Sequence, residues 1–204
     1  ELDVLFSCLP HGASHEALAP LVGAVKLIDL SGDFRLHDPA AYALAYAGAH
    51  PHPELLGRFV YGLPELNREA LRSADAVANP GCFATACTLA LLPLAKEGWL
   101  SGDVHLAAVT GSSGSGASPI DGTHHPTRSQ DFYAYKVLRH QHEPEIAQTL
   151  ADAGGASFAL HLVPHSAPVA RGIHVTAFVT LDPALDVAGA FERHYGPEPF
   201  VRLH

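Results

Sequence analysis

Short apolar segments alternate with helix-like segments along the first half of the chain. Residues 3–8 have the pattern of a buried strand, residues 14–22 that of a short helix with Ser14 as its N-cap, and residues 24–31 that of the next strand. An apolar segment at residues 75–79 again leads into a helix, after a Pro-Gly turn. Alternating strands and helices indicate a parallel sheet, so the sequence predicts an α/β fold.

The second half has a different pattern. Residues 104–113 resemble a strand, a helix is expected to start at residue 143, and two β-rich runs follow at residues 157–168 and 172–182. Polar and proline residues separate these two runs, with no helix between them. This favours an α+β domain with a mixed or antiparallel sheet, and we expect a domain boundary between residues 80 and 81.

The charge balance is acidic. The chain has 21 Asp and Glu against 12 Lys and Arg, a formal net charge of -9, and no cluster of basic residues. Nucleic acid and anionic membrane surfaces are therefore not expected as partners. No apolar run approaches the ~20 residues that span a bilayer. Three cysteines without a secretory signal pattern indicate reduced thiols in the cytoplasm.

The 15 histidines do not form a recognisable metal motif. Neither a CxxC pair nor an HExxH motif occurs. The closest approximations are His124 with His125 and His140 with His142. We expect no metal site.

Cys82 follows the Pro80-Gly81 turn and opens the predicted helix at residues 83–98. The first turn of a helix has free N–H groups and the positive end of the dipole, which stabilise a thiolate. Cys82 is thus placed to act as a nucleophile, and the alternative is a small buried apolar residue. Cys8 and Cys87 are expected in the core, and Pro93 is expected to kink or end the helix.

Several other polar residues are candidates for binding or proton transfer. Histidine as a residue type suits proton transfer near neutral pH, which makes His140 and His142 candidates, although such a pair is often merely exposed. Arg35 and Arg171 suit a carboxylate or phosphate, with a surface role as the alternative, and Asp33 is expected to pair with Arg35. The Gly/Ser loop at residues 111–118 offers N–H groups that would cradle a phosphate or nicotinamide, although most such loops are simple turns.

Seven segments together resemble the N-acetyl-gamma-glutamyl-phosphate reductase family, which is related to aspartate-semialdehyde dehydrogenase. VANPGCFATACTLALLP resembles its active-site signature, and TGSSGSGAS resembles its Gly-rich loop with Ser115 in place of the usual Ala. The other matching segments are VLFSCLPHGAS, IDLSGDFRLHDPAAY, GRFVYGLPELNRE, YKVLRHQHEPEI and VPHSAPVARGIHVT. The resemblance covers nearly the whole chain.

The resemblance implies a Rossmann-like NADP-binding domain at residues 1–80 and a catalytic and dimerisation domain at residues 81–204. It also implies an enzyme of arginine biosynthesis that forms a homodimer or homotetramer in the cytoplasm. The implied reaction is the reduction of N-acetyl-gamma-glutamyl phosphate to N-acetylglutamate 5-semialdehyde. It proceeds through a cysteine thioester, with hydride from NADPH. The implied site residues are Cys82, His142 and His140 for catalysis, with His142 slightly favoured as the proton shuttle, Arg35, Arg171 and Asn79 for the substrate, and Pro10, His11, Gly12, Ser113 and Gly114 for the cofactor.

Two alternatives remain open at this point. THHPTR, residues 123–128, resembles instead the reductase of carrier-protein-bound aminoadipyl or glutamyl phosphate in lysine biosynthesis. The second alternative is that the chain is not an enzyme but an inactive binding or assembly module.

The chain departs from the family pattern at both ends. No GxxGxxG motif, which would hold the cofactor pyrophosphate, is present. The family's last helix would lie beyond His204. We therefore expect that the chain is an internal piece of a longer protein, and that this piece alone binds NADPH poorly.

Overall fold

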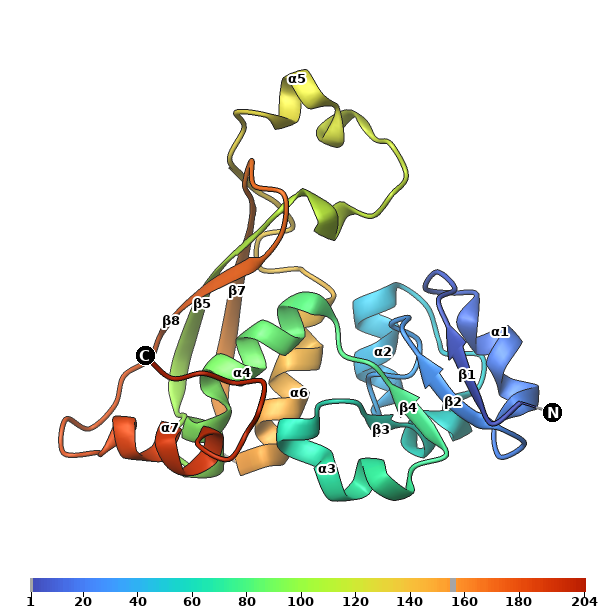
Figure 1. Cartoon of the computed structure of the whole chain (residues 1–204), viewed down its shortest axis with the longest axis horizontal. Coiled ribbons are helices and arrows are strands. Elements are labelled where there is room, and N and C mark those ends of the chain that lie inside the picture. The colour runs from blue at the N-terminus through green and yellow to red at the C-terminus, as the bar shows by residue number, and fades with distance from the viewer. Residues whose placement is uncertain (1, 155–156) are drawn as a thin grey trace. The chain divides into compact units, whose positions relative to one another are not determined.

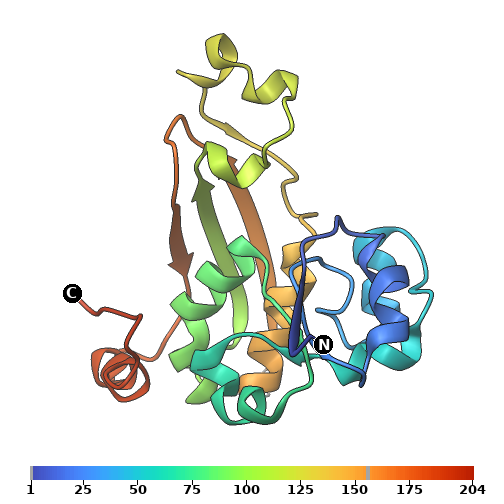
Figure 2. The same cartoon turned by 45° about the vertical axis from the view of Figure 1, so that its right-hand side comes forward.

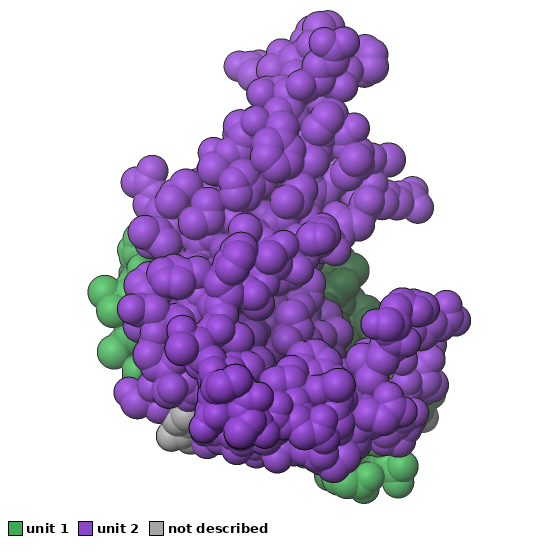
Figure 3. All heavy atoms as spheres, turned by 90° about the vertical axis from the view of Figure 1, so that its left-hand side faces the viewer, with its two compact units in different colours: residues 1–81 green, residues 82–204 purple. Residues whose placement is uncertain are grey.

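The structure is a computed structural model that describes residues 2–154 and 157–204. It contains two compact units, unit 1 at residues 1–81 and unit 2 at residues 82–204 (Figure 3). The division lies one residue after the boundary expected from the sequence. Within the described ranges, every helix is too short or too polar to cross a membrane.

Unit 1 contains a four-stranded sheet in which all neighbouring strands are parallel, in the order β1-β2-β4-β3 (Figure 1). This confirms the α/β prediction. The strands are β1 (Val4–Ser7), β2 (Lys26–Asp29), β3 (Val60–Tyr61) and β4 (Ala76–Ala78). The helices are α1 (Ser14–Leu18), α2 (Pro39–Tyr46) and α3 (Pro64–Ser73), with 3₁₀ helices at Ala19–Leu21 and Pro53–Arg58.

The core of unit 1 centres on two stacked phenylalanines. The rings of Phe34 and Phe59 lie 3.9 Å apart at an interplanar angle of 7°. Leu27 from β2 and Leu18 from α1 are buried in the same cluster. Burial of these side chains fixes the loops that follow β2 and precede β3, since Phe34 and Phe59 themselves lie in those loops.

Two expectations for unit 1 were wrong. Cys8 is exposed, because β1 ends at Ser7 and Cys8 already belongs to the following loop. Ser14 is the first residue of α1 rather than its N-cap, which is Ala13. Its hydroxyl instead donates to Asp29 Oδ1 at 2.6 Å, a partner 15 residues away that no local pattern indicates.

Unit 2 contains a mixed sheet, which confirms that prediction (Figure 2), and its four strands have the order β6-β7-β5-β8. β5 runs parallel to β7 and antiparallel to β8, and β6 runs antiparallel to β7. The strands are β5 (Gly102–Thr110), β6 (Tyr133–Ala134), β7 (Phe158–Ser166) and β8 (Ile173–Phe178). The helices are α4 (Cys82–Lys96), α5 (His125–Arg128), α6 (His142–Gly154) and α7 (Val187–Tyr195), with 3₁₀ helices at Ser112–Ser115 and Asp121–Thr123.

Helices α4 and α6 cover one face of this sheet. Alternate residues of β5, Val104, Leu106 and Ala108, point into a core shared with Leu91 of α4 and Ile146 of α6. Residues 111–132, here called the arm, project beyond the ends of β5 and β7 (Figures 1 and 2).

Pro93 does not end α4, which continues to Lys96 with Pro93 inside it. Proline has no N–H, so the carbonyl oxygen of Leu89, four residues earlier, loses its intrahelical donor. The Tyr195 hydroxyl from α7 donates to that oxygen at 2.5 Å. A residue 106 positions away in the sequence thus satisfies the carbonyl that Pro93 leaves unbonded.

This compensation predicts a coupled pair of substitutions. Tyr195→Phe should lower the free energy of unfolding by about 1–2 kcal/mol, because the Leu89 carbonyl loses its donor. In a Pro93→Ala background the cost should be smaller, since the introduced alanine supplies the N–H again. Urea unfolding of the four proteins in this cycle measures the coupling, and an equal cost in both backgrounds would refute the assignment.

Candidate active site

A cavity of about 320 Å³ lies in unit 2 where β5 and β7 end. Thr110 and Ser166, the last residues of these parallel strands, are paired in the sheet and line the cavity. α4 begins at the same place with Cys82. The carboxyl ends of parallel strands are the usual ligand-binding edge of an α/β sheet.

Cys82 is the first residue of α4, and it is exposed at the cavity. Its position beside the unpaired N–H groups of a helix start is the one that the sequence indicated. Cys87 lies one turn further along and is fully buried, as expected. Burial, followed by the charge of Cys82, raises the pKa of the Cys87 thiol to about 12. The two thiols of α4 therefore differ in access to solvent.

His140 and His142 are both buried and both line the cavity with Cys82. Their rings lie 4.7 Å apart. The ring of Phe83, the residue after Cys82, meets His140 edge-on at 5.4 Å and 87°, and His142 at 6.4 Å and 65°. The two expected histidines and the expected cysteine thus belong to one cavity, and the alternative of exposed, unconnected histidines does not hold.

His140 has a defined protonation state. Its Nδ1 accepts a hydrogen bond from the backbone N–H of His142 at 3.1 Å, so the ring proton resides on Nε2. Burial, assisted by the positive charge of Lys136, lowers the pKa of His140 from 6.5 to about 4. At neutral pH His140 is therefore an uncharged donor at Nε2.

The segment that carries the histidines is tied to β7. The N–H of Tyr135 donates to Pro164 O at 3.0 Å, and that of Leu138 donates to Leu162 O at 3.1 Å. Lys136 and Leu138 have φ angles of 45° and 53°, a left-handed conformation that side chains disfavour. These hydrogen bonds hold the segment in a conformation that it would not adopt by local preference.

Lys136 is a cavity residue that the sequence analysis did not select. Among the described residues that line the cavity it is the one Lys or Arg, and its Nζ donates to Gln141 Oε1 at 2.7 Å. The matching segment YKVLRHQHEPEI contained it, but an exposed lysine has no local feature that separates a binding role from a surface role.

Five N–H groups of the Gly/Ser loop, the predicted phosphate cradle, already have acceptors within unit 2. The N–H groups of Gly111, Ser112 and Ser113 donate to Gly172 O, Val169 O and Ala170 O at 2.8–3.1 Å. Those of Gly114 and Gly116 donate to carbonyls within the loop. These five groups are therefore occupied. Gly114 still lines the cavity, whereas Ser113 is not among its lining residues.

Arg171 lies in the turn between β7 and β8, outside the residues that line the cavity. Its turn packs tightly on the Gly/Ser loop. A Cβ on Gly111 would come within 2.9 Å of Arg171 N and of Val169 O, both backbone atoms, so only glycine fits there. The Gly/Ser loop therefore holds the turn that contains Arg171 in place through backbone hydrogen bonds and close packing.

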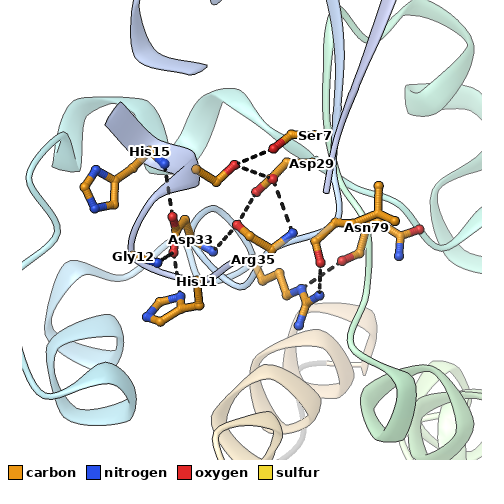
Figure 4. A network of polar contacts seen from close by, with 11 residues as sticks. Ser7, His11, Gly12, His15, Asp29, Asp33, Arg35 and Asn79 are labelled. Atoms are coloured by element: carbon orange, nitrogen blue, oxygen red, sulfur yellow. Dashed lines mark hydrogen bonds and ion pairs between the residues drawn. The ribbon is translucent and has the colours of Figure 1, made fainter. Parts of the chain in front are cut away.

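Two of the expected cofactor residues of unit 1, His11 and Gly12, contact Asp33 beyond the carboxyl ends of β1 and β2 (Figure 4). The fully buried carboxylate accepts from Gly12 N at 2.9 Å and His15 N at 3.0 Å, and it lies 2.5 Å from His11 Nδ1. Burial lowers the pKa of His11 despite this neighbour. Gly12 has a φ of 84°, which suits glycine, and its N–H is directed at Asp33.

Arg35 and Asn79 meet in unit 1, as Figure 4 shows. Arg35 Nε donates to Asn79 O at 2.8 Å, and Nη2 donates to Leu30 O at 2.9 Å. The guanidinium thus holds the segment that leads from β4 to the Pro-Gly turn. The hydrogen bonds described for the Asp33 carboxylate come from Gly12 in the loop after β1 and from His15 in α1, and its pairing with Arg35 stays a prediction.

Across the described ranges, no three His, Cys, Asp or Glu residues cluster closely enough to hold a metal ion.

Two protein-family models match the chain. The model described as "Semialdehyde dehydrogenase, dimerisation domain" matches residues 82–204, and "Semialdehyde dehydrogenase, NAD binding domain" matches residues 1–74. These ranges correspond closely to units 2 and 1.

The chain is also similar to curated proteins named N-acetyl-gamma-glutamyl-phosphate reductase. It is 43% identical over 203 residues to those of Pseudomonas syringae pv. syringae and Azotobacter vinelandii. Each comparison covers 98% of this chain and 59% of the relative. The chain thus spans 59% of the length of these relatives, and the resemblance seen in the sequence is confirmed.

Solved structures share the fold. The aspartate semialdehyde dehydrogenase II of Vibrio cholerae complexed with ASA has a TM-score of 0.63 at 15% identity, covering 98% of this chain and 62% of that one. The aspartate semialdehyde dehydrogenase of Candida albicans with NADP has a TM-score of 0.56 at 14% identity, covering 92% and 53%. At such identities the likeness concerns the fold alone.

The low pKa of His140 predicts a loss of stability in acid. Below about pH 6.5 an unfolded histidine binds a proton while folded His140 stays neutral down to about pH 4, so acid favours unfolding across this window. As the pH falls from 6.5 to 4, the free energy of unfolding should decrease less for the His140→Asn variant than for the unaltered protein.

His124→Asn, at an exposed histidine of the arm, is the matched control and should behave as the unaltered protein does. Denaturant unfolding at several pH values measures both slopes. Equal acid slopes for the two variants would contradict the assignment of this effect to His140.

Proposed function

The chain belongs to the semialdehyde dehydrogenase family, and we propose that the protein it comes from is an NADPH-dependent N-acetyl-gamma-glutamyl-phosphate reductase. It would reduce N-acetyl-gamma-glutamyl phosphate to N-acetylglutamate 5-semialdehyde in arginine biosynthesis. The relatives that are 43% identical bear this name. The observation that carries the proposal is the meeting of Cys82, His140 and His142 in one cavity.

Cys82 is the proposed nucleophile. Its sulfur attacks the acyl carbon of the substrate, and the carbon–oxygen bond to phosphate breaks. Inorganic phosphate departs, and the acyl group remains on Cys82 as a thioester. Sulfur donates little electron density to the carbonyl, so the thioester accepts hydride readily. NADPH, when bound, supplies that hydride. The resulting oxyanion lies at the start of α4, where helix N–H groups and the helix dipole stabilise negative charge.

His142 is the proposed proton carrier. After hydride transfer the oxyanion would take a proton from His142, and collapse of the resulting thiohemiacetal would break the carbon–sulfur bond, return the hydroxyl proton to His142 and release the aldehyde and the Cys82 thiolate. His140 is unsuited to accept a proton near neutral pH, because its pKa lies at about 4. It would instead orient the substrate or the oxyanion through Nε2–H, while its Nδ1 fixes the backbone of His142.

Lys136 is the proposed contact for the phosphate end of the substrate. An acyl phosphate is anionic, and the other cavity residues supply no lysine or arginine charge within the described part of the chain. Three further residues remain proposed substrate contacts. Arg171 lies in the turn between β7 and β8, and Arg35 and Asn79 lie in unit 1. Ser113 and Gly114 remain proposed next to the nicotinamide, through surfaces other than their occupied N–H groups.

The Pro10–Gly12 loop is the proposed cofactor contact in unit 1. It lies at the carboxyl end of a parallel strand, which is where dinucleotides bind in such sheets. Because Gly12 N–H is bonded to Asp33, the loop would contribute the exposed surfaces of Pro10 and His11 rather than this donor. The family model that matches unit 1 is a NAD-binding one, and a fold neighbour was solved with NADP.

A homodimer, or a homotetramer built from it, is the proposed assembly, in the cytoplasm and without nucleic acid or membrane partners. The family model over unit 2 is described as a dimerisation domain. The sheet face opposite α4 and α6 exposes Phe178 and has a hollow of about 460 Å³ lined by His105, His161 and Val163. This face is the proposed contact with a second copy.

The test is consumption of NADPH with N-acetyl-gamma-glutamyl phosphate in the full-length protein. Cys82→Ser should lower kcat by at least about 10³-fold, because the thioester cannot form. Cys8→Ser, at the exposed thiol of unit 1, is the matched control and should keep kcat unchanged. Full activity of Cys82→Ser would refute the nucleophile, and an inactive unaltered protein would support the binding-module alternative.

The same assay with a carrier-protein-bound aminoadipyl phosphate separates the two acyl groups. A higher kcat/KM with N-acetyl-gamma-glutamyl phosphate is expected. A preference for the carrier-bound substrate would instead favour the lysine-biosynthetic alternative that THHPTR suggested.

A further inference from the structure

Arg128 of the arm is a buried cation without an acidic partner among the described residues. It is 5% exposed, and its hydrogen bonds go to neutral oxygens, from Nε to Ser112 Oγ at 3.0 Å and from Nη2 to Ala167 O. Nη1 is buried and has no hydrogen-bond partner within the same ranges. A buried charge left without a counter-charge is costly, so a guanidinium in this setting calls for an anion.

A cavity of about 400 Å³ adjoins Arg128. Its wall combines Arg128 with hydroxyl groups, an imidazole and apolar residues of the turn after β7, and none of its described lining residues is Asp or Glu. The cavity that contains Cys82 shares none of these lining residues. The wall is therefore positively charged and distinct from the catalytic cavity.

Some hydrogen-bond donors that line this cavity already have acceptors, and others have none within the described ranges. The hydroxyls of Ser112 and Thr123 already donate to Val169 O and Ile120 O. His125 and Ser129 line the same cavity, are exposed, and use their side chains in no hydrogen bond within the described ranges. An imidazole N–H, a hydroxyl and an uncompensated guanidinium are the donor set that oxyanions bind in proteins.

We propose that this cavity is a second anion site that binds a small tetrahedral oxyanion of the phosphate class between Arg128, His125 and Ser129. The site does not depend on the proposed function, because none of its residues belongs to the catalytic cavity. The bound anion would supply the counter-charge for Arg128, whose hydrogen bonds join the Gly/Ser loop at Ser112 to the turn at Ala167. Binding would thereby stabilise the loop pair that presents Arg171.

The first test is thermal unfolding of the full-length protein in inorganic phosphate, with chloride at equal ionic strength as reference. Phosphate should raise the Tm of the unaltered protein by several degrees, since a ligand that binds only the folded state stabilises it. Arg128→Met should lose most of this rise. Arg139→Met, at an exposed arginine, is the matched control and should keep it. An undiminished rise in Arg128→Met, or no rise in the unaltered protein, would overturn the proposal.

The second test needs no variant, and it decides the matter if Arg128→Met does not fold. Crystals of the full-length protein soaked in tungstate, a heavy tetrahedral dianion, should show an anomalous peak next to Arg128 and Ser129. An empty cavity would overturn the proposal, as would a carboxylate side chain of a second protein chain in contact with Arg128.

Discussion

The buried ring of Phe83 connects the two parts of the candidate active site. It follows Cys82 directly on α4, and its edge-on contacts with His140 and His142 link the start of that helix to the segment before α6. Only 1% of the Phe83 side chain is exposed, so its burial stabilises the core and aligns the site at once. The Phe83 side chain thereby fixes the position of Cys82, at the start of α4, relative to His140 and His142 near the start of α6.

The rest of unit 2 supports this contact. Pairing of β5 with β7 in parallel brings Thr110 and Ser166 to one edge, and hydrogen bonds to β7 hold the left-handed residues Lys136 and Leu138. The Gly/Ser loop uses its N–H groups on the neighbouring turn, where Gly111 leaves no space for a side chain. Backbone N–H groups beside the cavity thus fix the loop and the segment before α6, and the side chains of Cys82, the two histidines and Lys136 line the cavity between them.

Sequence patterns predicted those features that depend on local periodicity or on contiguous motifs. The parallel sheet, the mixed sheet, the position of Cys82 at a helix start and the burial of Cys87 belong to this group. Features set by long-range partners were missed. Ser14 bonds to Asp29, Tyr195 satisfies the carbonyl opposite Pro93, and Asp33 binds the loop after β1, none of which leaves a signal in neighbouring residues. The exposure of Cys8 likewise depends on where a strand stops, which periodicity locates poorly.

Position on α4 separates its two thiols, because Cys82 lies exposed at the helix start and Cys87 is buried within the helix. The direct measurement is the pH dependence of iodoacetamide alkylation at each cysteine of the full-length protein, resolved by peptide mapping. We expect Cys82 to be alkylated faster than the exposed Cys8 near neutral pH, because it lies at a helix start, and Cys87 to stay unmodified because burial raises its pKa to about 12. A profile for Cys82 that matches that of Cys8 or Cys87 would contradict this expectation.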